Sequence, residues 1–178
     1  RDVNLWTGKD VYISHDKLRI TTLSVNDDIA VIEVCAQLKN IIGHGLEAEC
    51  LIEIKKDGQK TASDTQRVVF RSEQMQTVRV QIPIEHPKKW SPKQPALYEC
   101  HITTKFDDKI CDEAVSNFGI RVLALDPVHG LQINGETVKL RGTCIHHDNG
   151  VIGAETFKEA EWYRCKRLKE AGFNAIRS

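Results

Sequence analysis

Alternating apolar and polar positions predict β-strands along most of the chain. Within residues 47–55, for example, every second side chain is apolar and most of the others are charged. Similar alternation predicts strands at residues 18–24, 29–38, 47–55, 67–70, 76–82, 97–105 and 116–123. Polar turns at residues 26–28, 43–45, 56–58 and 107–108 separate them. About seven short strands in roughly 105 residues are typical of an immunoglobulin-like antiparallel β-sandwich, which we place at residues 15–123.

The N-terminal segment has two interpretations. Residues 1–13 predict a strand that ends in Val11–Ile13, after a turn at Thr7-Gly8. This strand is either an edge strand of the sandwich or the last piece of a preceding domain.

The pattern changes after a short linker at residues 124–130. Asn134-Gly135 lies between two β-prone runs and predicts a two-residue hairpin with positive φ at both positions. A strand at residues 141–148, a helix at 156–171 and a strand at 173–178 then predict a βαβ unit, with Gly172 ending the helix. We expect Phe157, Cys165 and Leu168 on the buried face of the helix, although Glu161 shares that stripe. The fold class is therefore mainly β.

Composition excludes several classes of partner. The 25 basic and 25 acidic residues balance, so the charge indicates no nucleic-acid partner. No apolar run approaches the ~20 residues that a membrane span needs. The six cysteines include Cys35 and Cys100, whose spacing suits an immunoglobulin disulfide. Strand parity points Cys35 outward and Cys100 inward, however, so we expect free thiols. Free thiols mildly favour a reducing compartment such as the cytoplasm, and the compartment stays open.

Polar residues gather where each strand of the predicted βαβ unit ends. His146, His147 and Asp148 follow the first strand, and Arg177 lies near the end of the second. In parallel α/β folds, sites form at these carboxyl ends. Adjacent residues on a strand point to opposite faces and no third ligand is spaced to join the histidines, so we expect no metal and no cofactor. Hydrogen-bonded capping of the strand and helix is the alternative for the polar cluster, and a buried salt bridge is the alternative for Arg177.

Several sequence runs carry a resemblance to a known family. LQINGETVKLRGTCIHHDNG followed by GFNAIRS is similar to the start of the catalytic TIM barrel of glycoside hydrolase family 2. Upstream, NLWTGKDVYI resembles the last strand of that family's sugar-binding jelly-roll domain. WSPKQPALYECHIT and VSNFGIRVL resemble the end of its immunoglobulin-like middle domain. The resemblance thus implies an internal fragment, with residues 1–14 ending the sugar-binding domain, 15–123 forming the sandwich and 124–178 beginning a truncated barrel.

The resemblance also implies roles for the polar residues. His146 matches a histidine that lines the sugar-binding subsite, and Asp148 matches an acidic position that orients the substrate. Arg177 matches an arginine that hydrogen-bonds the nucleophilic carboxylate. Cys144 stands where the family usually has Asn. Trp90 is either a sugar-stacking platform or, as the resemblance favours, a structural pin in its loop.

The implied activity belongs to a longer protein. The HHDNG run most resembles the β-galactosidase branch, which implies a retaining exo-glycosidase acting on terminal β-D-galactosides, with β-glucuronides and β-mannosides as alternatives. The family's general acid/base follows an Asn, and no Asn-Glu dipeptide occurs in this sequence. We therefore expect both catalytic glutamates beyond Ser178 and an inactive fragment.

Two other expectations follow from the same segments. A stand-alone immunoglobulin-like module that binds a glycan or a protein is the alternative to an enzyme fragment.

Two parallel strands and one helix leave an unpaired sheet edge. We therefore expect this edge to pack on the sandwich or on another copy of the chain, and the second arrangement would give a homo-oligomer.

Overall fold

A computed structural model describes residues 5, 7–71, 74–146 and 149–178. The chain separates into two compact units. One unit contains Trp6–Leu123 together with Ile133–Gly135, and the other contains Ala124–Gln132 and Glu136–Ser178 with Arg1–Leu5. No described helix is long and apolar enough to cross a membrane.

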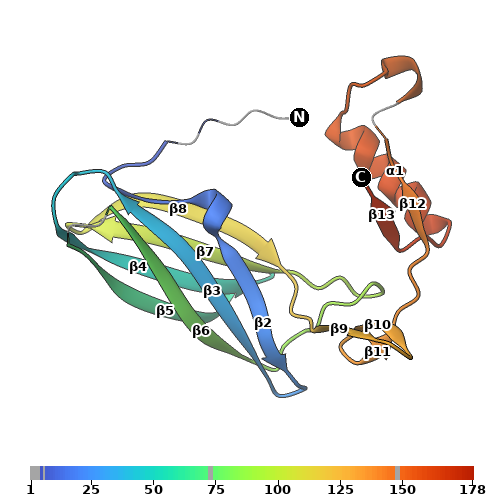
Figure 1. The fold of residues 1–178 in the computed structure, drawn as a ribbon, viewed down its shortest axis with the longest axis horizontal. Helices are drawn as coiled ribbons and strands as arrows, with labels where there is room; N and C mark the ends of the chain where they lie inside the picture. Colours follow the sequence, from blue (N-terminus) through green and yellow to red (C-terminus); the bar gives the residue numbers. More distant parts are fainter. Residues whose placement is uncertain (1–4, 6, 72–73, 147–148) are drawn as a thin grey trace. The chain divides into compact units, whose positions relative to one another are not determined.

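The first unit is a sandwich of two antiparallel sheets (Figure 1). In one sheet, β3 (Ile29–Asn40) pairs with β6 (Met75–Glu85) along one edge. Along its other edge β3 pairs with β1 (Val11–Ile13) and β2 (Arg19–Val25), which the 3-10 turn η1 (His15–Lys17) separates. The second sheet has the order β5 (Gln59–Phe70), β4 (Leu46–Lys56), β7 (Tyr98–Phe106) and β8 (Lys109–Phe118).

The core lies between these sheets and follows the alternation in the sequence. Every second residue of β3 is buried from Ala30 to Leu38, and every second residue of β4 from Leu46 to Ile54. Cys100 is buried whereas Cys35 is half-buried, as strand parity predicted, and all six cysteines are free thiols. The predicted mainly-β fold class is confirmed.

Strand β1 is tied to both sheets of the sandwich. Its pairing with β3 makes it an edge strand, which is one of the two arrangements that the sequence left open for Val11–Ile13. The Asp112 carboxylate accepts a hydrogen bond from the Ile13 amide (2.8 Å), and the buried Thr104 hydroxyl donates to the Val11 carbonyl (2.8 Å). The assignment of residues 1–14 to the end of a preceding sugar-binding domain stays a prediction.

The bounds predicted for two strands of the sandwich were wrong. Strand β5 begins at Gln59 rather than at residue 67, because pairing with β4 orders a polar run that alternation alone does not reveal. Strand β8 spans Lys109–Phe118 rather than residues 116–123. The expected linker at residues 124–130 contains β9 (Leu123–Asp126) and the turn that leads into β10 (Gly130–Ile133).

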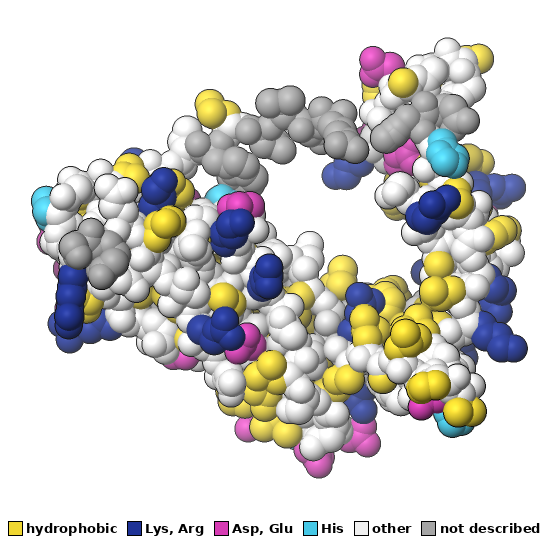
Figure 2. All heavy atoms as spheres, viewed as in Figure 1, with side chains coloured by type: hydrophobic (Ala, Val, Ile, Leu, Met, Phe, Trp, Pro, Cys, Tyr) yellow, Lys and Arg dark blue, Asp and Glu magenta, His cyan; other side chains and the backbone are white. Residues whose placement is uncertain are grey.

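A carboxylate stabilises that turn between β9 and β10. Asp126 Oδ1 accepts hydrogen bonds from the amides of His129 (2.6 Å) and Val128 (2.8 Å). These bonds hold the pKa of the Asp126 carboxyl below its usual value, and the bond from the His129 amide has the largest effect. Figure 2 shows apolar side chains at the surface over β9 and β10, where Leu125 and Val128 are largely exposed.

The elements that follow β9 match the predicted hairpin and βαβ unit. A turn with positive φ at Asn134 (53°) and Gly135 (82°) joins β10 to β11 (Glu136–Thr137), so the predicted hairpin is confirmed. Strand β12 (Gly142–Cys144), the 3-10 turn η2 (Gly150–Ile152), helix α1 (Lys158–Glu170) and strand β13 (Ala175–Arg177) follow. Gly172 has φ 87°, the left-handed conformation expected after the helix.

The expected buried face of α1 was wrong except at Leu168. Phe157 and Cys165 are exposed, whereas Glu161, Arg164 and Leu168 are the half-buried positions within the helix. These three positions recur at helical spacing, so the helix turns a partly charged stripe inward. Its aromatic residues Trp162 and Tyr163 are exposed.

Burial in the sandwich predicts sharply different reactivity among the thiols. Desolvation, the larger cause in each case, raises the pKa of Cys50 and of Cys100 from 9.0 to about 12. Their thiolate fraction at pH 8 is then about 10³-fold below that of an ordinary thiol. We expect Ellman's reagent to label the exposed Cys144 and Cys165 quickly in the folded protein, and Cys50 and Cys100 only in denaturant. Peptide mass spectrometry at timed quenches measures this, and rapid labelling of Cys100 without denaturant would contradict it.

Candidate active-site edge

The carboxyl ends of two parallel strands form the candidate site. Strands β12 and β13 are paired in parallel, with Gly142 opposite Ala175 and Cys144 opposite Arg177. The ladder continues one step further, because the Ile145 amide donates to the Arg177 carbonyl (2.9 Å). His146 follows directly and is exposed. His146 and Arg177 thus lie at the same edge of neighbouring parallel strands, whereas His147 and Asp148 lie outside the described residues.

The amino ends of the same strands are held by Asn174 and Arg141. Asn174 Oδ1 accepts from the Arg141 amide (2.7 Å), and its Nδ2 donates to the Lys139 carbonyl (3.0 Å). The Arg141 Nε donates to the Gly172 carbonyl (3.0 Å), which ties the start of β12 to the turn after the helix. These contacts support the register that places Cys144 opposite Arg177. The sequence reasoning did not single out either residue, although an Asn between a helix stop and a strand is a recognisable signal.

Arg177 makes its side-chain contacts with a thiol. Its Nε and Nη2 donate to Cys144 Sγ at 3.3 and 3.0 Å. Both side chains are exposed, and no carboxylate among the described residues lies within ion-pair distance of Arg177. The buried salt bridge considered for Arg177 is therefore absent from the described part of the chain.

The described side chains at this edge define the chemistry that it can support. Among the residues that the structure describes, no three His, Cys, Asp or Glu side chains are grouped to hold an ion. The site as described consists of one imidazole, one guanidinium and one thiol. Such a set can form hydrogen bonds to hydroxyl groups and can bind a carboxylate, but it contains no pair of carboxylates for acid/base chemistry.

Trp90 in the sandwich unit acts as a structural pin, because its contacts fix the loop that carries it to the sandwich. Its amide donates to the Ile120 carbonyl (2.9 Å), and the Arg121 guanidinium lies 4.2 Å from its ring centroid. Its ring packs so closely on Gly119 that a Cβ there would lie 2.8 Å from ring atoms. The ring is therefore engaged by the protein itself, which favours the structural interpretation over a sugar-stacking platform.

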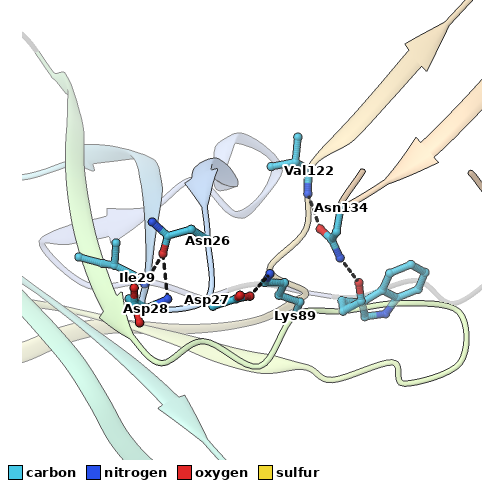
Figure 3. A network of polar contacts seen from close by, with 8 residues as sticks. Asn26, Asp27, Asp28, Ile29, Lys89, Val122 and Asn134 are labelled. Atoms are coloured by element: carbon cyan, nitrogen blue, oxygen red, sulfur yellow. Dashed lines mark hydrogen bonds and ion pairs between the residues drawn. The ribbon is translucent and has the colours of Figure 1, made fainter. Parts of the chain in front are cut away.

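A polar network surrounds this pin (Figure 3). Asn134 reaches from the hairpin turn, accepting from the Val122 amide (3.0 Å) and donating to the Trp90 carbonyl (3.0 Å). Nearby, Lys89 pairs with Asp27 (2.7 Å), which lowers the pKa of that carboxyl. Asn26 caps the same turn by accepting from the amides of Asp28 and Ile29. This explains why β8 ends at Phe118: the backbone beyond it bonds to Trp90 and Asn134 instead of to β7.

Comparisons with known proteins identify the family. The model of "Glycosyl hydrolases family 2" matches residues 11–121. The beta-galactosidase BoGH2A of Bacteroides ovatus is 27% identical over 187 residues, which cover 98% of this chain and 21% of that protein. A beta-glucuronidase of Bacteroides fragilis is 30% identical over 95 residues, covering 53% of this chain and 14% of that protein.

Solved structures agree with the sequence relatives. A glycosyl hydrolase family 2 member from Bacteroides cellulosilyticus superposes with a TM-score of 0.90 at 32% identity, over 94% of this chain and 22% of that one. The chain thus spans about a fifth of the length of proteins that it matches nearly end to end. The sequence motifs, the sandwich and these matches lead to one conclusion: the chain belongs to glycosyl hydrolases family 2.

Proposed function

We propose that this chain is a segment of a retaining exo-glycosidase that hydrolyses terminal β-D-galactosides. In this proposal residues 124–178 begin a catalytic TIM barrel, and the sandwich is its immunoglobulin-like neighbour. The observation that carries the proposal is the parallel pair β12 and β13, with His146 and Arg177 at its carboxyl edge. Catalytic groups of such barrels lie at that edge.

Each polar residue has a proposed role in binding or orienting. His146 is exposed at the edge and would form hydrogen bonds to sugar hydroxyls, which tighten in the transition state. Asp148 would orient the substrate from two residues further on. Arg177 would bind the nucleophilic carboxylate through its guanidinium and keep that carboxylate ionised. No metal or cofactor is part of the proposal.

The 178-residue chain should be inactive by itself. Retaining glycosidases need two carboxyl groups about 5 Å apart, one as acid/base and one as nucleophile. The chain contains no Asn-Glu dipeptide, which is the motif expected for the acid/base. We therefore place both glutamates in later strands of a longer protein.

A panel of nitrophenyl glycosides tests the function. We expect the full-length protein that carries this chain to release nitrophenol fastest from the β-D-galactoside, and the 178-residue chain to release none above background. Nuclear magnetic resonance of the first-formed sugar anomer should show retention of configuration. An inactive full-length protein on every substrate would favour the alternative of a binding module.

A β-glucuronide is the second candidate substrate. The support is the similarity to beta-glucuronidases, including the one from Bacteroides fragilis. Faster hydrolysis of the β-D-glucuronide than of the β-D-galactoside in the same panel would select this candidate. β-Mannosides complete the panel as a third arm.

An oligomer through the barrel segment is a separate proposal. In the 178-residue chain, Leu140, Ile176 and Trp162 are exposed in the second unit. An uncovered strand edge with apolar neighbours tends to pair with another chain. Light scattering of the 178-residue chain across a tenfold concentration range would report the mass, and a constant monomer mass would contradict the proposal.

A further inference from the structure

We infer that Cys144 is the positioning residue for Arg177, and that its sulfur leaves one edge of the guanidinium aimed at the site. This inference rests on the proposed function and assigns a role to a side chain that otherwise has none. It begins from the two hydrogen bonds between the Arg177 guanidinium and Cys144 Sγ.

The backbone brings the two residues together before their side chains meet. Cys144 and Arg177 are direct partners in the parallel ladder, and the following amide of Ile145 closes on the Arg177 carbonyl. Residues paired directly across two strands project to the same face of the sheet. The thiol is therefore adjacent to the stem of Arg177 whichever rotamer the arginine adopts.

The geometry of the guanidinium explains what this contact leaves free. Arginine offers paired N–H donors along two edges, one formed by Nε with Nη2 and one by Nη1 with Nη2. The sulfur receives Nε at 3.3 Å and Nη2 at 3.0 Å, so it occupies the first edge. The second edge keeps the fork that binds a carboxylate through two parallel hydrogen bonds.

The choice of a thiol preserves the charge that the site needs. Sulfur is a weak acceptor, so it can orient the guanidinium without neutralising it. A carboxylate at position 144 would form an ion pair with Arg177 and compete with the carboxylate that arginine is proposed to hold. Without any acceptor, the long arginine side chain would populate other rotamers, and the fork would face the site for a smaller fraction of time.

Exchange of the arginine side-chain protons tests the contact in the 178-residue chain. We expect the Arg177 Nε–H to exchange with water several-fold faster in Cys144→Ala than in the unsubstituted chain, and Cys144→Ser to restore most of the protection. Arg141, whose Nε donates to the Gly172 carbonyl, is an internal reference that should not change. Cys165→Ser, at the exposed thiol on α1, is the matched control. Equal exchange at Arg177 in all four proteins would overturn the contact.

Kinetics of the full-length protein test the role in catalysis. We expect Cys144→Ala to lower kcat about 10-fold with KM little changed, because the effect acts on a group that stabilises the reacting carboxylate. The acidic limb of the pH profile should move to higher pH, since a carboxylate that loses a well-placed cation is protonated more easily. Cys144→Ser should recover most of both, and Cys165→Ser should match the unsubstituted enzyme.

The outcomes separate the inference from the function on which it rests. An active enzyme whose kcat and pH profile do not change in Cys144→Ala overturns the positioning role and leaves the proposed function intact. An unsubstituted protein that is inactive on the whole glycoside panel overturns the proposed function and the catalytic part of the inference together. In that case the proton-exchange result still decides whether Cys144 holds Arg177.

Discussion

Replacing Phe70 with alanine is expected to lower the free energy of unfolding by about 3–5 kcal/mol. Phe70 is 1% exposed, ends β5 and is among the largest fully buried side chains of the sandwich core. Its removal deletes a ring from between two sheets whose backbones are fixed by long hydrogen-bonded ladders, so the cavity can collapse only partly. Urea unfolding followed by circular dichroism in the β-sheet band measures the change.

The adjacent residue provides the control for Phe70. Val69 belongs to the same strand but points to the opposite face and is 49% exposed. We expect Val69→Ala to change stability by no more than about 0.5 kcal/mol. Similar losses in the two variants would mean that the effect comes from the β-propensity of this strand and not from the core.

Replacing Arg177 with glutamine is expected to lower kcat/KM of the full-length enzyme by about 10²–10³-fold. Under the proposed function, this removes a charged donor aimed at the reacting carboxylate, and losses of this size follow the removal of one such preorganised donor. The acidic limb of the pH profile should move to higher pH, because the carboxylate loses the cation that favours its ionised form. Arg177→Lys should lie between the two, since lysine keeps the charge but lacks the planar fork.

A second arginine of the same unit controls for charge. Arg167 is exposed on α1 and pairs with Glu170 at 3.1 Å, three residues along the same helix. Arg167→Gln should leave kcat/KM within about twofold, since exposed helix pairs contribute little. Equal losses for Arg167→Gln and Arg177→Gln would remove Arg177 from the proposed site.

The sequence predicted the parts of the fold whose signal is local. Alternation in β3 and β4 is strong because both strands lie inside their sheets, with one face on the core. The Asn134-Gly135 turn and the Gly172 helix stop each depend on backbone conformations that few residues adopt, so composition reveals them. The helix was also predicted within two residues of its observed N-terminal boundary.

The features of the fold that could not be predicted depend on contacts between residues that are distant in the sequence. Residues 59–66 are polar except for Ala62, and only pairing with β4 identifies them as strand. Phe118, Ile120 and Val122 alternate as a strand would, yet the Trp90 amide and the Asn134 side chain take the backbone bonds beyond Phe118. The inward stripe of α1 contains Glu161 and Arg164, which a hydrophobic pattern cannot select.

The candidate site was predictable in position but not in its contacts. The rule that sites form at carboxyl strand ends selected His146 and Arg177 from strand order alone. The Cys144 contact was not foreseen, because it depends on the one-to-one register of β12 with β13. The hydrogen bonds that Arg141 and Asn174 make at the amino ends of these strands depend on the same register.

The attachment of β1 to both sheets limits how this molecule can be trimmed. An expression boundary or a protease cut after Ile13 would strip two buried side chains, Val11 and Ile13, from the core. It would also remove the Val11 carbonyl, the nearer of the two acceptors of the buried Thr104 hydroxyl, and the Ile13 amide that donates a hydrogen bond to the Asp112 carboxylate. In the shortened sandwich the buried Thr104 hydroxyl would lose a hydrogen bond, and β3 would lose its pairing with β1. Any recombinant version of this unit should therefore begin upstream of Val11.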